Sequence, residues 1–203
     1  MAALEMIARD APLNDVLAQI CRLAEAFVPG SMAGVAVLDR GGMTFEHCVM
    51  PSAPRFAAGI PGVEVEPPPA STDSGNDERF EPLWRKLDTD LGVRAIRSRP
   101  VCSADGRALG SFFMAFREGA PDPWPEEIEA IGARLSGFAL ERHRAAERQT
   151  LLVAEMQHRL KNLFAAVLSI ASQTAQAGVT NVDFLKAFEG RILALANRHG
   201  LLT

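Results

Sequence analysis

The chain has 203 residues, of which 48% are hydrophobic and 23% are charged, and its formal net charge at pH 7 is −4. This composition is typical of a globular protein with room for one full domain and a smaller unit. The acidic net charge does not favour nucleic-acid binding, because proteins usually bind nucleic acid through a basic surface.

Membrane, disulfide and metal signals are weak along the chain. No apolar run approaches the ~20 residues of a membrane span, and the N-terminus lacks an apolar signal core, so we expect a cytoplasmic protein. Cys21, Cys48 and Cys102 are odd in number and widely spaced. They predict no disulfide framework and no zinc site, and we expect buried, reduced thiols. No cofactor or metal site is predicted within the chain.

The first part of the chain predicts an α+β domain with an antiparallel sheet. Apolar residues spaced by three and four indicate a helix over 11–27. Two strands, 32–39 and 43–50, follow around a Gly-Gly turn. Residues 51–79 are rich in Pro, Ser, Gly and Asp and predict mostly loop. A helix over 80–92 ends near Gly92, and strands are expected over 93–103 and 107–118, the former at an edge or bulge because it contains proline.

From Asp122 onward the pattern becomes helical. No proline lies between Glu126 and Gln176, which predicts one helix of about 50 residues, or ~75 Å. Apolar residues at 128, 131, 135 and 138 begin a 3-4-3 spacing typical of a coiled-coil connector. Two consecutive spacings of four, 152 to 156 to 160, form a stutter that changes supercoiling locally. The mixed-charge run over 141–148 is predicted to be a solvated helix surface.

The end of the chain predicts a helical hairpin. The apolar spacing continues after the stutter, a turn is expected at 178–181, and a second helix follows. One hairpin buries little apolar surface, whereas two make a four-helix bundle, so a homodimer is implied. The apolar positions are Met156, Leu160, Leu163, Val167, Ile170 and Thr174 on the first helix and Leu185, Phe188, Ile192, Leu195 and Leu202 on the second.

His158 points away from the apolar positions of its own helix, which lie about 120–200° around the axis from it. An exposed imidazole is a competent nucleophile because one ring nitrogen is unprotonated near neutral pH. On the same face, Lys161 is placed to meet phosphate oxygens, Asn162 to orient the ring or a phosphate, and Glu155 to accept the Nδ1–H and favour a nucleophilic Nε2. Surface helices also carry such residues without any chemical role, and that alternative stays open on the pattern alone.

The segment EMQHRLKNLFAAVLSIASQT (155–174) resembles the phosphoacceptor box of the HWE family of histidine kinases, His-Arg-x-Lys-Asn followed by an apolar helix. FEGRILALANRHGLL (188–202) resembles that family's second bundle helix. The resemblance implies a two-component protein in which His158 is phosphorylated from ATP and passes phosphate to a response-regulator aspartate. Arg159 stands where commoner histidine kinases have an acid, and we hypothesise that Glu155 replaces that acid.

Residues 11–145 resemble a GAF domain in element order and in the segments DGRALGSFFMAFRE (105–118) and PWPEEIEAIGARLSGFALER (123–142). GAF domains bind small ligands or chromophores, or dimerise, and the ligand expected here is unknown. The residue pair that attaches bilins and the signature of cyclic-nucleotide binders are both missing. Phe56, Trp84 and Phe113 are predicted to be either core residues or ligand contacts.

Three domains are therefore expected: a GAF-like core (1–122), a closing helix and coiled-coil connector (123–146), and a dimerisation and phosphoacceptor hairpin (147–203). An ATP-binding domain does not fit within these residues, so ATP with Mg²⁺ is expected to act through such a domain in cis or in trans, and the chain alone should not autophosphorylate. The alternatives are a stand-alone phosphotransfer protein and a ligand-binding dimerisation module. For signalling, we hypothesise that an event at the GAF-like domain rotates or bends the long helix.

Overall fold

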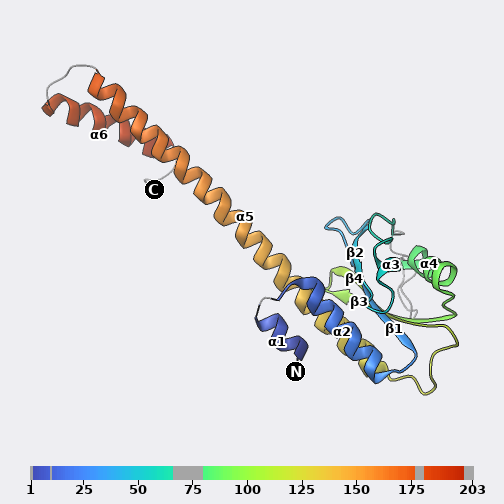
Figure 1. Ribbon diagram of the computed structural model, residues 1–203. Helices are drawn as coiled ribbons and strands as arrows, with labels where there is room; N and C mark the ends of the chain where they lie inside the picture. Colours follow the sequence, from blue (N-terminus) through green and yellow to red (C-terminus); the bar gives the residue numbers. More distant parts are fainter. Residues whose placement is uncertain (1, 10, 66–79, 177–180, 199–203) are drawn as a thin grey trace. The chain divides into compact units, whose positions relative to one another are not determined.

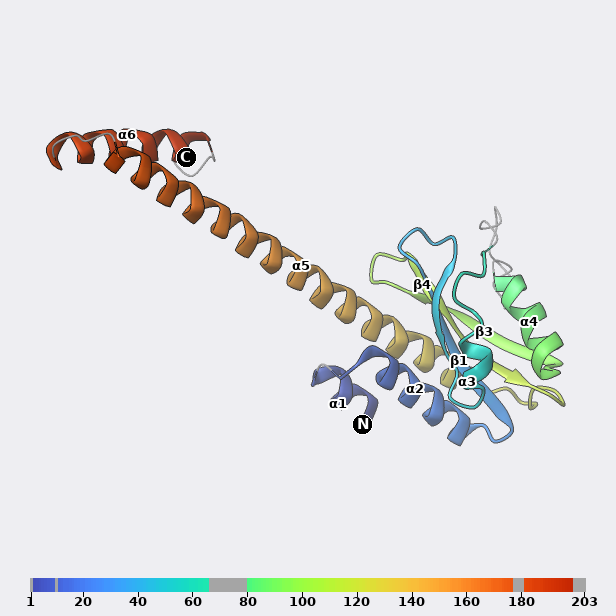
Figure 2. The same cartoon turned by 45° about the horizontal axis from the view of Figure 1, so that its top comes forward.

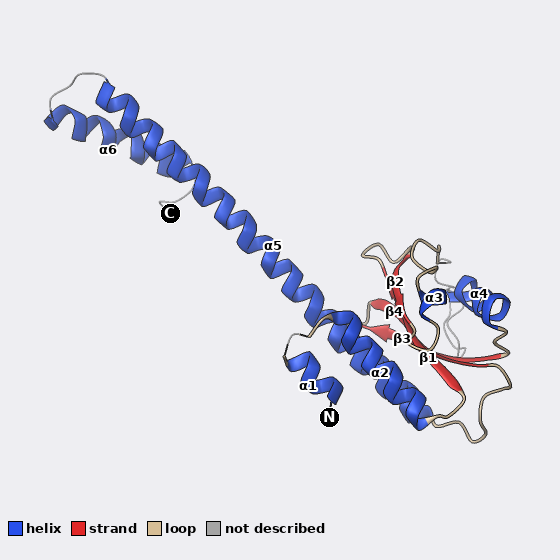
Figure 3. Cartoon of the chain, viewed as in Figure 1, coloured by secondary structure: helices blue, strands red, loops and turns tan. Residues whose placement is uncertain are grey.

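The computed structural model describes residues 2–9, 11–65, 80–176 and 181–198 and divides into two compact units, Met1–Ala145 and Ala146–Thr203, called here the first and second units (Figures 1 and 3). The helices and strands are, in chain order, α1 (Ala2–Ala8), α2 (Leu13–Phe27), β1 (Ser31–Leu38), β2 (Phe45–Val49), α3 (Pro54–Ala57), α4 (Glu81–Leu91), β3 (Ala95–Cys102), β4 (Ala108–Phe116), α5 (Glu126–Gln176) and α6 (Asn181–Arg198).

The first unit is built on a four-stranded antiparallel sheet of order β2-β1-β4-β3. Successive side chains of a strand point to opposite faces, so Phe112 joins the core on one face and Phe113 the core on the other. Helices α2 and the start of α5 cover the first face, and α3 and α4 cover the second (Figure 2). This confirms the predicted α+β class with an antiparallel sheet.

Two glycines explain how α5 packs so closely on the sheet. A Cβ at Gly132 would lie 2.5 Å from Cζ of Phe112, and one at Gly137 would lie 2.7 Å from the carbonyl oxygen of Cys102. Glycine is a poor helix former, but only a residue without a side chain permits these contacts. The helix therefore meets the sheet through a face of small residues.

Most predicted elements of the first unit are confirmed. Gly92 ends α4 in the left-handed conformation, with φ of 66°, and Pro100 lies on β3, an edge strand. The short helices α1 and α3 were not predicted, and part of the expected loop, 66–79, lies outside the described residues. The prediction of three buried thiols was wrong for Cys102, which is exposed because it lies after a register shift at the end of edge strand β3.

The second unit contains the end of α5 and α6, which folds back alongside it (Figure 1). The predicted single helix from Glu126 to Gln176 is confirmed. Of the predicted apolar positions, Leu163, Val167 and Ile170 on α5 and Phe188 and Ile192 on α6 are half-buried. Residues 177–180, in the predicted turn, and Leu202 lie outside the described residues. The four-helix bundle remains a prediction.

Candidate functional site

His158 is exposed on α5 in the second unit, and every residue from Leu151 to Asn162 is exposed around it. Its Nδ1 lies 3.5 Å from Nδ2 of Asn162, one helical turn ahead. The amide of asparagine offers either a donor or an acceptor when it turns over, so it can pair with either tautomer of the imidazole. With the carbonyl oxygen facing Nδ1–H, the lone pair is on Nε2.

Glu155 has a different partner from the one predicted. Its Oε1 accepts hydrogen bonds from Arg159 at 2.5 Å from Nη2 and 3.1 Å from Nε. The Arg159 guanidinium is a stronger partner for this carboxylate than a neutral imidazole, because its hydrogen bond is charge-assisted. The i,i+4 spacing also places the two side chains next to each other on the helix. The structure thus brings Asn162 rather than Glu155 to Nδ1, while Lys161 is exposed on the same side of the helix.

Two apolar rows are together centred on the side of the helix opposite His158, and the second extends to within about 80° of it at Leu168. Leu163, Val167 and Ile170 form the half-buried row, at about 120–180° from His158. The second row is exposed at about 160–280° and consists of Met156 (65% exposed), Leu160 (46%), Phe164 (66%) and Leu168 (67%). The line midway between the two rows points away from His158. Covering both rows would therefore leave this imidazole facing solvent.

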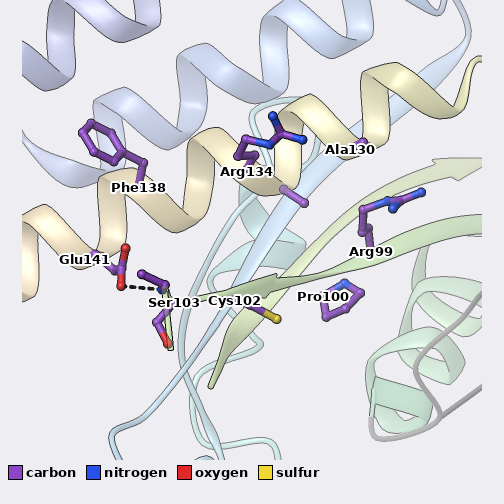
Figure 4. A pocket seen from close by; sticks show the side chains of 10 residues that line it. Arg99, Pro100, Cys102, Ser103, Ala130, Arg134, Phe138 and Glu141 are labelled. Carbon is purple, nitrogen blue, oxygen red and sulfur yellow. Dashed lines mark hydrogen bonds between the residues drawn. The ribbon is translucent and has the colours of Figure 1, made fainter. Parts of the chain in front are cut away.

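The first unit has a shallow hollow of about 400 Å³ between β3 and α5 (Figure 4). Two of its three charged side chains, Glu141 and Arg99, have partners in the chain, and Arg134 is the third. The carboxylate of Glu141 accepts a hydrogen bond from the Ala104 amide at 2.8 Å, and Arg99 lies 4.0 Å from the buried Glu129. Burial raises the pKa of Glu129, although the hydrogen bond from Trp124 opposes that shift.

On the other face of the sheet, aromatic rings fill the space beside α4. Trp84 contacts Phe113 edge to face, with ring centroids 5.5 Å apart, and also lies against Phe80 at 6.1 Å. Phe56 is 8% exposed, Trp84 7% and Phe113 0%. The three aromatic residues that were predicted as either core or ligand contacts are therefore core residues.

The structure also shows a set of contacts that the sequence did not suggest. In the last turns of α5 within the first unit, Arg144 donates to the Leu38 carbonyl at 2.7 Å and Arg142 to the Ala8 carbonyl at 3.4 Å. Together with the Glu141–Ala104 bond, they form what we call the polar clamp. The prediction that 141–148 is simply a solvated surface was wrong here, since Glu141 and Arg144 are half-buried. Neither residue type nor spacing distinguishes these side chains from solvated ones.

Within the described residues, no group of three or more His, Cys, Asp and Glu is arranged to hold a metal ion. None of the described helices combines the length and apolar character needed to cross a membrane. The candidate site on α5 is an exposed histidine on a helix surface.

One known protein is similar to most of this chain. The chain is 30% identical over 176 residues to the methyl sulfide methyltransferase-associated sensor of Methanosarcina acetivorans, a match that covers 79% of this chain and 17% of that relative. The chain thus spans about a sixth of the length of this curated relative.

Two solved structures are similar at low identity. One, from Sinorhizobium meliloti 1021, is described as a domain of a two-component sensor histidine kinase protein (16% identity, TM-score 0.47, 67% of this chain and 95% of that chain). The other is a phytochrome photosensory core module of Stigmatella aurantiaca (13%, 0.46, 96% and 43%).

The family comparison concerns the segment that carries His158. Residues 155–203 match the family described as HWE histidine kinase. This range includes the whole His-Arg-x-Lys-Asn box and the second helix, as the resemblance of the two segments implied. The segment 155–203, which carries His158, is thus an HWE histidine kinase segment.

Proposed function

We propose that this chain is the sensory and phosphoacceptor part of a two-component histidine kinase, and that Nε2 of His158 carries the phosphoryl group. The observation that supports this most is the position of His158, opposite both apolar rows of α5 and within the family-matched segment. A dimer that buries the exposed row leaves the imidazole outside the bundle, where a catalytic domain and then a response regulator have access to it.

The proposed reaction needs little covalent machinery from this chain. The Nε2 lone pair attacks the γ-phosphorus of ATP, an N–P bond forms, and the bond to the β–γ bridging oxygen breaks to release ADP. When the Asn162 amide is turned over from Nδ2 to its carbonyl oxygen, that oxygen accepts the Nδ1–H, and the lone pair of Nε2 is free to react. Lys161, on the same face, stabilises phosphoryl charge. Transfer to an aspartate of the response regulator then breaks the N–P bond and restores the imidazole.

The ATP-binding domain is not within these residues, and we propose that it acts in cis or in trans. The test incubates the purified chain with the catalytic domain of an HWE kinase and radiolabelled ATP, and separately with a phosphorylated response regulator. Acid-labile, alkali-stable label is expected on the chain, and it should be lost in His158→Gln but kept in His143→Gln, a matched change at another exposed histidine of α5. Label that survives His158→Gln would refute the assignment.

Two other functions are distinguished by the same experiment. Label obtained only from the phosphorylated regulator favours a stand-alone phosphotransfer protein. No label under either condition favours a ligand-binding dimerisation module without phosphotransfer, a role that the GAF-like order of elements in the first unit would support.

A further inference from the structure

We propose that the hollow between β3 and α5 binds a small organic carboxylate with an apolar body, held by Arg99 and Arg134. The hollow has a volume of about 400 Å³, within the usual range of small-molecule sites. It lies on the α5 side of the sheet, away from the aromatic core beside α4, and belongs entirely to the first unit. This site is therefore independent of the phosphoacceptor role of His158 and of any dimer.

Strand β3 and helix α5 run in the same direction along the hollow. Near one end, Nε of Arg99 lies 4.0 Å from Oε1 of Glu129. At the other end, Ala104, just after β3, donates its amide hydrogen to Glu141. Arg134 is five residues after Glu129 and seven before Glu141, or ~8 Å and ~10 Å along the helix axis. Arg134 therefore stands about midway, and its long side chain can meet a ligand that also touches Arg99.

The charge of Arg134 is available to a ligand. Among the residues that the structure describes, none is hydrogen-bonded or ion-paired to its guanidinium. The side chain of Arg99 is 44% exposed and approaches the buried Glu129 through Nε, which leaves its terminal nitrogens for another partner. A guanidinium presents paired N–H donors whose geometry matches the two oxygens of a carboxylate. The carboxylate of the hollow itself, Glu141, is already bound to the Ala104 amide.

Apolar side chains beside Arg134 indicate the rest of the ligand. Phe138 is 54% exposed and lines the hollow together with Ala130 and Pro100. In Figure 4, Phe138, Arg134 and Arg99 follow one another along the hollow. Because Arg134 and Phe138 are four residues apart, they are separated by ~6 Å along the helix axis. A ligand that meets both therefore carries its carboxylate close to an apolar group, as a short arylalkanoate does.

Cys102 provides a natural probe of the hollow. Its thiol is exposed and lines the hollow. Burial raises the pKa of the Cys48 thiol to about 12 and that of Cys21 well above its usual value. The thiolate is the form that reacts with iodoacetamide, so alkylation of the folded chain should be confined to Cys102. A carboxylate bound between β3 and α5 should shield this thiol.

The test measures the rate of Cys102 alkylation in the full chain by peptide mass spectrometry, with phenylpropionate as the probe. A ligand of this size should bind with a Kd of about 1 mM, so about 10 mM of it should slow alkylation about tenfold. Arg134→Gln should raise the Kd at least about fivefold, which reduces the protection to about threefold or less. Arg94→Gln, at an exposed arginine outside the hollow, is the matched control and should keep full protection.

Each variant is compared with its own alkylation rate without the probe, and tryptophan fluorescence checks that the first unit remains folded. If Arg134→Gln fails that check, Arg134→Lys replaces it. Lysine keeps the charge but not the paired donors, so the protection should be intermediate.

Several results would overturn the site. Full protection in folded Arg134→Gln, or no protection of the unmodified chain at any soluble concentration of phenylpropionate, would each show that the arginine does not hold this ligand. Equal protection by phenylpropionamide, which has the same body without the charge, would exclude a charged contact. Equal protection by acetate would contradict the contact with Phe138. Protection by inorganic phosphate but not by phenylpropionate would contradict the carboxylate class.

Discussion

The close packing of α5 on the sheet makes an unusual prediction about alanine in a helix. Replacing an interior helix glycine by alanine normally stabilises a helix by about 1 kcal/mol. Gly137→Ala should instead destabilise the first unit, because the new Cβ would lie 2.7 Å from the carbonyl oxygen of Cys102. The obstacle is backbone at the end of β3, so no side chain can turn aside to relieve it.

The magnitude follows from two opposing terms. Overpacking in a well-packed site costs about 1–3 kcal/mol, and the helix propensity of alanine returns about 1 kcal/mol. A backbone obstacle places the cost near the upper end, so we expect a net loss of about 1–2 kcal/mol in the free energy of unfolding, or roughly 2–8 °C in Tm. Gly190 in α6 is the matched control, since a Cβ there meets nothing within 4 Å.

The tryptophans make the assay specific. Both tryptophans of the sequence, Trp84 and Trp124, lie in the first unit, so urea unfolding followed by their fluorescence reports that unit. Gly137→Ala should lower the fluorescence midpoint, and Gly190→Ala should leave it unchanged while raising the helical signal at high temperature. If Gly137→Ala raised the fluorescence midpoint, the close approach of α5 to β3 would be refuted.

Three further predictions concern polar contacts. Asn162→Ala should slow phosphorylation of His158 more than Glu155→Gln does, because Asn162 lies against Nδ1 while Glu155 binds Arg159; equal rates of labelling would contradict this. Arg144→Gln should destabilise the first unit by about 1 kcal/mol, since it weakens a charged hydrogen bond to the Leu38 carbonyl, whereas Arg134→Gln, at an exposed residue of the same helix, should not. Burial chiefly lowers the pKa of His47; Glu46 opposes that shift, and His143 and Arg144 add to it. The unfolded chain therefore binds this proton at a higher pH than the folded chain does, and the free energy of unfolding should fall as the pH drops below about 6.5. His47→Gln should reduce this dependence on pH when unfolding is followed by fluorescence.

The sequence predicted the elements whose signals are periodic. Apolar spacing placed α2 to within two residues, the absence of proline placed α5, and Gly92 correctly marked the end of α4. The exposed position of His158 followed from the same spacing, because the apolar positions of a helix determine which residues point the other way.

Contacts made between distant segments were not predictable in this way. The partner of Glu155 was misjudged because two candidates, His158 and Arg159, lie within one turn, and only geometry distinguishes them. The bond from Arg144 to Leu38 joins residues 106 apart in the chain. In the sequence this arginine looks like any other residue of a mixed-charge helix, so the polar clamp leaves no local signal.

The packing of α5 also restricts how a signal can travel. Rotation of α5 by one residue, about 100°, would turn Gly132 and Gly137 away from the sheet and put residues with side chains in their place. At these two positions even a Cβ would lie 2.5 Å from Cζ of Phe112 and 2.7 Å from the carbonyl oxygen of Cys102. Rotation would also break the polar clamp. Of the two hypotheses, rotation and bending, we therefore favour bending or repacking after Ala145. Deleting residues 146–149 shifts the apolar spacing before the deletion by about 40° relative to that after it. In a complete kinase this deletion should change basal phosphorylation of His158 while the first unit keeps its fluorescence midpoint. If phosphorylation were unchanged, the rotational position of the apolar residues before the stutter would not influence His158.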